Sequence, residues 1–175
     1  MLPSPRNSPE GHASLIERTQ CKLLLYSEGM ETHVEAIKEI APQIIFVQVP
    51  SFNDFRDQGS KSEPYAGHYS EAEDASVLVL HTSGSTGLPK PIYLTNGGLA
   101  VTGLFQSMAR MEGRTNTADV LFAPDKKMFC MSPFFHAMGA IMMSRSLMCR
   151  APLVLMPAEK PPNAQLVLDV LEKSR

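Results

Sequence analysis

The chain has 175 residues, of which 43% are hydrophobic and 19% are charged, proportions that are ordinary for a globular protein. Its formal net charge of −2 gives no general attraction to nucleic acid or to anionic membranes, so we expect neither partner. The sequence has no apolar run of about 18 residues, and no transmembrane helix is therefore expected.

The first part of the chain predicts a strand–helix–strand unit. Residues 11–19 form an amphipathic segment, and the apolar run at 22–26 predicts a strand. Residues 31–40 place apolar side chains near helical spacing, and the β-branched run at 44–49 predicts the next strand. A helix between two strands over this short distance indicates a βαβ unit with a parallel pair.

The middle of the chain is more polar. Residues 50–74 carry many charges with interspersed glycine and proline, which predicts a long polar loop. The apolar residues 77–80 predict a strand. Farther on, Asn96 is expected to cap a helix of roughly 15 residues.

The last part of the chain alternates again between strands and helices. Residues 128–131 and 152–156 predict strands, with a buried helix at 138–148 between them and a final helix that starts at Asn163. This alternation indicates an α/β fold with a mixed or parallel sheet and flanking helices.

Three cysteines, Cys21, Cys130 and Cys149, are too widely spaced for a metal or redox pair. We therefore expect free thiols in a reducing compartment, which favours the cytoplasm.

The segment after the strand at 77–80 has the chemistry of a phosphate-binding loop. It reads His81-Thr82-Ser83-Gly84-Ser85-Thr86-Gly87-Leu88-Pro89-Lys90-Pro91. Glycines let main-chain N–H groups approach an anion, hydroxyls add neutral donors, and the lysine adds a mobile positive charge. The spacing of Gly87 and Lys90 excludes a Walker loop, and the dinucleotide pattern G-x-G-x-x-G is absent. The alternative is a surface turn without a ligand.

A second signal is the segment Ser132-Pro133-Phe134-Phe135-His136-Ala137-Met138-Gly139. A histidine after two aromatic residues, with a glycine three positions later, suits an apolar pocket with one polar group at its mouth. The alternative is a histidine that belongs to the hydrophobic core.

The two segments together resemble the adenylate-forming superfamily, which includes acyl-CoA synthetases, luciferases and the adenylation domains of nonribosomal peptide synthetases. The family's signature, Thr-Ser-Gly-Ser/Thr-Thr-Gly-x-Pro-Lys, matches residues 82–90 at every specified position. The residues at 4–9 and at 87–92 are most similar to those of nonribosomal-peptide-synthetase-like enzymes. The resemblance implies that residues 1–175 form a single partial AMP-binding domain, an incomplete large N-terminal subdomain without the C-terminal subdomain.

The resemblance also implies a reaction. An ATP-dependent ligase of this family converts a carboxylic acid to an acyl-adenylate and pyrophosphate, and then passes the acyl group to CoA or to the pantetheine of a carrier protein. ATP and Mg²⁺ are the implied cofactors, with no Mg²⁺ ligand in this chain. Because the family's downstream motifs are missing, we assign no catalytic residue and expect the isolated chain to be inactive and poorly soluble.

Two alternatives remain open. One is a non-catalytic remnant or docking subunit with weak nucleotide binding. The other is a phosphate-binding α/β domain unrelated to adenylation.

The same resemblance assigns the site residues. The β- and γ-phosphates would be cradled by Thr82, Ser83, Gly84, Ser85, Thr86 and Gly87. Lys90 would neutralise the leaving pyrophosphate. His136 would lie beside the substrate carboxylate, and Phe135 and Gly139 would shape the acyl pocket.

Overall fold

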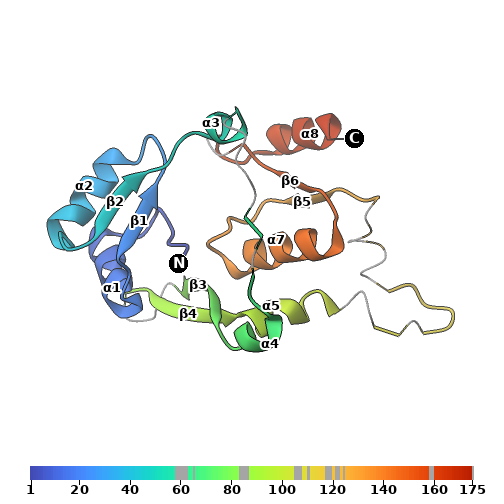
Figure 1. Cartoon of the computed structure of the whole chain (residues 1–175). Helices are drawn as coiled ribbons and strands as arrows, with labels where there is room; N and C mark the ends of the chain where they lie inside the picture. The colour runs from blue at the N-terminus through green and yellow to red at the C-terminus, as the bar shows by residue number, and fades with distance from the viewer. Residues whose placement is uncertain are drawn as a thin grey trace. The chain divides into compact units, whose positions relative to one another are not determined.

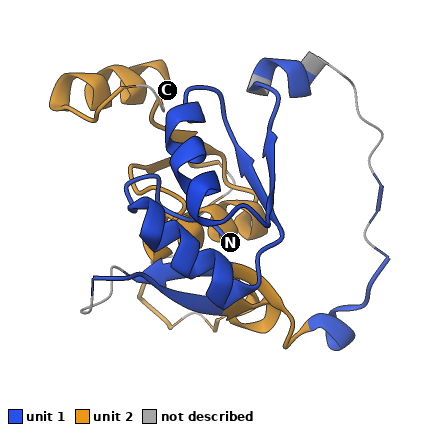
Figure 2. Ribbon diagram, turned by 90° about the vertical axis from the view of Figure 1, so that its left-hand side faces the viewer, with its two compact units in different colours: residues 1–72, 79–93 blue, residues 73–78, 94–175 orange. Residues whose placement is uncertain are grey.

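The structure is a computed structural model that describes residues 1–57, 63–64, 66–82, 87–104, 108–109, 111–116, 120, 123, 125–157 and 160–174. The chain divides into two compact units (Figure 2). Unit 1 comprises residues 1–72 and 79–93, and unit 2 comprises residues 73–78 and 94–175.

Unit 1 is built on a parallel pair of strands with helices beside it (Figure 1). Its first elements are α1 (Pro9–Thr19), β1 (Leu23–Tyr26), α2 (Glu31–Ile40) and β2 (Ile45–Gln48). The two strands pair in parallel, with Leu24 opposite Phe46. The predicted βαβ unit and its parallel pairing are therefore confirmed.

The two faces of this strand pair differ in burial. Ile16 of α1 and Ile37 of α2 belong to a buried core cluster, against which Leu24 and Phe46 pack. Side chains alternate along a strand, so their neighbours point to the opposite face. The exposed apolar side chains on that face are Leu23, Leu25, Ile45 and Val47. Parallel sheets are ordinarily covered on both faces, whereas the described elements of unit 1 cover only one face of this strand pair.

The segment 50–74, which we expected to be a loop, contains two short helices, α3 (Phe52–Asp57) and α4 (Tyr69–Ala72). A reciprocal cap explains the first of them. The Ser51 N–H donates to Asp54 Oδ2 at 2.9 Å, and the Asp54 N–H donates to Ser51 Oγ at 3.3 Å. This pairing satisfies two N–H groups that a helix start leaves free, so a short polar segment can still begin a helix.

The strands β3 (Ser76–Thr82) and β4 (Lys90–Thr95) pair with each other, and their residues are divided between the two units. The remaining elements of unit 2 are α5 (Asn96–Val101), β5 (Met128–Cys130), α7 (Ala137–Cys149), β6 (Leu153–Leu155) and α8 (Ala164–Lys173). β5 and β6 are a parallel pair. Met128 and Cys149 belong to the core cluster of unit 2. No helix in the described part of the chain is long and apolar enough to cross a bilayer.

The predicted cap and length of the helix at Asn96 are wrong. α5 ends at Val101, and its cap is Thr95, whose extended backbone lets Oγ1 accept from the Gly98 N–H at 3.1 Å. At the other end, the Thr102 hydroxyl donates to the Leu99 carbonyl at 2.6 Å. Such a local bond competes with continuation of the helix.

His12 on α1 is a buried titratable group, with 4% of its surface exposed. Its Nδ1 lies 3.2 Å from the Ser8 carbonyl oxygen, and its ring meets the His33 ring edge-on with centroids 4.9 Å apart. Burial lowers the pKa of His12. The Ser8 carbonyl opposes this shift, and the positive charges that His33 and His81 can carry add to it.

We expect the free energy of unfolding to fall when the pH drops from about 7.5 to about 5. A histidine in the unfolded chain has a pKa of about 6.5, whereas the lowered pKa of folded His12 keeps its ring neutral to lower pH. The stability that neutral His12 contributes is therefore complete above about pH 6.5. It is lost as the pH falls through the lowered pKa of the folded state. Urea unfolding at several pH values measures this loss.

His12→Asn separates this effect from other titrations, because asparagine offers an N–H to the Ser8 carbonyl and does not titrate. We expect the variant to lose less stability at low pH than the wild type. The exposed His68 provides the control, His68→Asn, which should keep the wild-type pH dependence. A His12→Asn profile identical to that of the wild type would contradict the prediction.

Candidate functional site

The structure places the two ends of the predicted phosphate loop at strand ends. β3 ends at Thr82 and β4 begins at Lys90, and both side chains are exposed. Four of the predicted phosphate-binding residues, Ser83, Gly84, Ser85 and Thr86, lie outside the described residues. Two described segments enter and leave the loop, residues 81–82 and residues 87–90, and we call them its stems.

Gly87 in the second stem has a backbone conformation that suits glycine. Its φ is +86°, in the left-handed region that other residues rarely adopt. A Cβ built on it would meet no atom within 4 Å among the described residues beyond its chain neighbours. Backbone geometry therefore explains the glycine.

Lys90 supplies the positive charge of this stem. Its ammonium makes no hydrogen bond or ion pair with any residue that the structure describes. An exposed ammonium without a protein partner is available to an anionic ligand as a point charge.

The second motif lies in unit 2, at the start of α7. His136 is the N-cap residue of this helix, but its side chain is exposed and makes no capping hydrogen bond. Its main-chain N–H donates to the Pro133 carbonyl at 3.0 Å, which closes the turn before the helix. The His136 and Phe135 rings are tilted by 45° with centroids 4.9 Å apart. The imidazole is therefore beside an aromatic ring and open to a ligand.

Gly139 is explained by the packing of this turn. A Cβ built on Gly139 would lie 2.2 Å from the Pro133 carbonyl oxygen and 2.7 Å from the Ser132 carbonyl oxygen. Only glycine lets the backbone of Ser132 and Pro133 lie this close to the first turn of α7. Its role in an acyl pocket stays a prediction.

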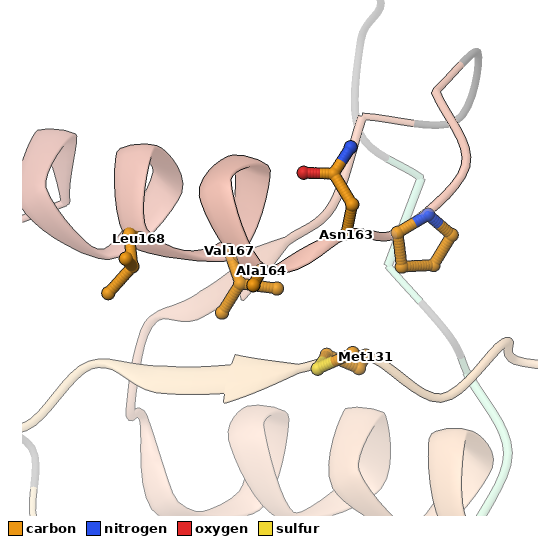
Figure 3. Close-up of a pocket in the computed structure, with 6 residues that line it drawn as sticks. Met131, Asn163, Ala164, Val167 and Leu168 are labelled. Carbon is orange, nitrogen blue, oxygen red and sulfur yellow. The ribbon is translucent and has the colours of Figure 1, made fainter.

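Unit 2 also contains an apolar pocket of about 470 Å³ (Figure 3). Ala164, Val167 and Leu168 of α8 line it on the side opposite Met131, while the Asn163 amide points away from Met131. Among the described residues, those that line it are Met131, Pro162, Asn163, Ala164, Val167 and Leu168. The residues predicted to shape the acyl pocket, Phe135, His136 and Gly139, are not among these lining residues.

The acidic, histidine and cysteine side chains of the described residues form no group of three or more that could hold a metal ion. None of them is therefore assigned as a ligand of Mg²⁺.

Sequence reasoning missed the role of His81, which directly precedes Thr82. Its Nε2 accepts a hydrogen bond from the Ser4 main-chain N–H at 2.9 Å. Its Nδ1 is buried and has no partner among the described residues. The position of His81 beside the loop was a signal, but its partner lies 77 residues away in the sequence.

Comparison with known proteins places these motifs in one family. The sequence model described as AMP-binding enzyme matches residues 3–175. The chain is 32% identical over 171 residues to a carboxylic acid reductase of Neurospora crassa, which covers 97% of this chain and 16% of that protein. It is 35% identical over 102 residues to the adenylate-forming reductase Nps9 of Serpula lacrymans, which covers 53% of this chain and 9% of that protein. These matches confirm the predicted resemblance.

The fold is shared with solved structures of adenylate-forming enzymes. The O-succinylbenzoate coenzyme A synthetase of Bacillus subtilis, solved with ATP and magnesium, superposes with a TM-score of 0.66 at 17% identity. The superposition covers 98% of this chain and 40% of that one. The predicted class, a partial N-terminal subdomain of mixed α/β structure, is confirmed. The chain spans less than a fifth of the length of the two reductases.

We expect Gly139→Ala to destabilise the protein by about 2 kcal/mol or more, because the added methyl group meets carbonyl oxygens of the backbone that cannot move without opening the turn. Gly98→Ala is the matched control. Gly98 is also a helical glycine of unit 2, and the nearest atom to its added Cβ is Thr95 Oγ1 at 3.4 Å. Alanine has less backbone entropy than glycine in the unfolded chain, so Gly98→Ala should leave the stability unchanged or raise it. Chemical denaturation compares the two variants, and equal effects would contradict the packing role of Gly139.

Proposed function

Because this chain belongs to the AMP-binding enzyme family, we propose that it forms the phosphate-binding part of an ATP-dependent ligase that activates a carboxylic acid as an acyl-adenylate. One observation carries the proposal. Residues 82–90 match the family signature, and its two ends, Thr82 and Lys90, are exposed at the ends of the paired strands β3 and β4. A polyanion can therefore meet both stems without first displacing a partner of Lys90 among the described residues.

The proposed chemistry begins with the acid. A carboxylate is already ionised at neutral pH and needs no general base. One of its oxygens attacks the α-phosphorus of ATP, and the bond from that phosphorus to the pyrophosphate oxygen breaks. Thr82, Lys90 and the N–H groups beside Gly87 would hold the β- and γ-phosphates, and the lysine would stabilise the charge on the leaving pyrophosphate.

On the acid side, we propose that His136 orients the carboxylate. Its exposed imidazole has no capping hydrogen bond, so a ring N–H is free to donate to a carboxylate oxygen. Phe135, whose ring lies beside His136, would contact the apolar part of the acid. The acyl group would then pass to a thiol, either CoA or the pantetheine of a carrier protein. The three free cysteines favour a cytoplasmic protein.

Lys90→Ala tests the phosphate side in the protein that carries this chain. Loss of one charged hydrogen bond to phosphate should lower kcat/KM for ATP roughly 10- to 100-fold in an acid-dependent ATP–pyrophosphate exchange assay. Lys38→Ala is the control, since the Lys38 ammonium is paired with Glu35 at 2.6 Å. Wild-type rates in Lys90→Ala would overturn this assignment. Nucleotide binding without any acid-dependent exchange, in the wild type, would favour a non-catalytic remnant or docking subunit.

His136→Ala tests the acid side. We expect a higher KM for the carboxylic acid with little change in the KM for ATP, because His136 would contact only the acid. His68→Ala, at another exposed histidine, should change neither constant. An equal rise in both constants for His136→Ala would contradict a role confined to the acid.

A further inference from the structure

The beginning of the chain lies along the strand that leads into the phosphate loop. The Leu2 N–H donates to the Val79 carbonyl, and the Ser4 N–H donates to His81 Nε2, both at 2.9 Å. From the first bond to the second, the donor and the acceptor residue each advance by two positions, so residues 2–4 run parallel to β3. The His81 side chain, and not a main-chain carbonyl of β3, accepts the second bond.

This bond defines the state of His81. Because an N–H points at Nε2, that nitrogen must carry a lone pair, and the proton of the neutral ring is on Nδ1. A doubly protonated ring would offer only donors and would lose the bond. Ser4 is 6% exposed, so its N–H has little access to water as a substitute. Asn7 adds a second contact, since its Nδ2 lies 3.4 Å from the same nitrogen.

The second stem of the loop meets the same part of the chain. A Cβ on Gly11 would lie 3.3 Å from Pro89 Cδ, so the first turns of α1 pack directly against the residue before Lys90. Ser8 caps this helix by accepting from the Gly11 N–H at 3.2 Å. The first stem is held at His81 and the second at Pro89. The segment that holds both is residues 2–11, which we call the N-terminal clasp.

The groups that face His81 come from the clasp and from α1. Ser4 and Asn7 face it from the clasp, and both are uncharged. His12 of α1 is close enough to be coupled to His81 electrostatically, and the ring of His33 of α2 touches that of His12. Among the described residues, no carboxylate bonds to these three rings that could stabilise a charged imidazole.

We propose that His81 is a positioning residue of the phosphate loop. Its neutral ring holds the N-terminal clasp against β3 and thereby fixes the first stem, which ends at Thr82. The role rests on the proposed function of the loop. It requires an acceptor at the position of Nε2, and this requirement distinguishes it from a histidine that only fills space.

Two substitutions separate these possibilities in the protein that carries this chain. His81→Phe keeps the ring shape and removes the acceptor. His81→Gln keeps an acceptor oxygen near the position of Nε2 and does not titrate. We expect His81→Phe to weaken ATP binding about three- to tenfold, and His81→Gln to stay near the wild type. His68→Gln is the control at an exposed histidine.

Thermal unfolding of each variant shows whether it is folded at the temperature of the assay.

Hydrogen exchange at the Ser4 amide reports on the clasp without any nucleotide. It should be slow in the wild type and in His81→Gln, and faster in His81→Phe. Wild-type ATP affinity in folded His81→Phe would overturn the proposal, and so would an affinity in His81→Gln as low as in His81→Phe. A wild-type protein that binds no ATP would overturn the function proposed for the loop and this role with it, while the Ser4 amide would still show whether the clasp forms.

Discussion

Two hydrogen bonds fix the start of this chain to the strand that carries the signature loop. One joins the Leu2 N–H to the Val79 carbonyl, and the other joins the Ser4 N–H to His81. The chain continues from there into α1, whose residues Leu15 and Ile16 are almost completely buried. The position of the loop stems is therefore tied to the hydrophobic core of unit 1 through a single helix.

Sequence patterns predicted the features that depend on neighbouring residues. The spacing of apolar residues located α2 and the two strands of the parallel pair, because burial on one face imposes that spacing. The reciprocal cap of Ser51 and Asp54 was also readable, as a serine followed three residues later by an acid, but the polar composition of the segment obscured it. The bond to His81 could not be predicted, because the sequence does not show which of many distant N–H groups will approach a given imidazole. The sequence predicts that Gly139 shapes the acyl pocket. The structure shows another reason for a glycine there, which is the close approach of the Ser132 and Pro133 backbone.

The two halves of the proposed chemistry belong to different compact units. The stems of the phosphate loop, at Thr82 and Lys90, are in unit 1, and the motif at His136 is in unit 2. Each unit has its own core cluster. A substitution that damages one core should therefore affect binding of one substrate more than the other. The exposed apolar face of β1 and β2 belongs to unit 1, the same unit as the loop stems.

The distance in sequence between Ser4 and His81 also bears on how the protein folds. Their contact spans 77 residues, whereas β1, α2 and β2 are consecutive and can assemble locally. Closing a long stretch of chain costs more entropy than closing a short one, and distant contacts form slowly unless others have formed before them. The βαβ unit should therefore form early and the clasp late. A chain still being synthesised, or one locally unfolded at its start, would therefore have a formed βαβ core while the clasp is still open, so the nucleotide binding that we propose would come only after the clasp has closed.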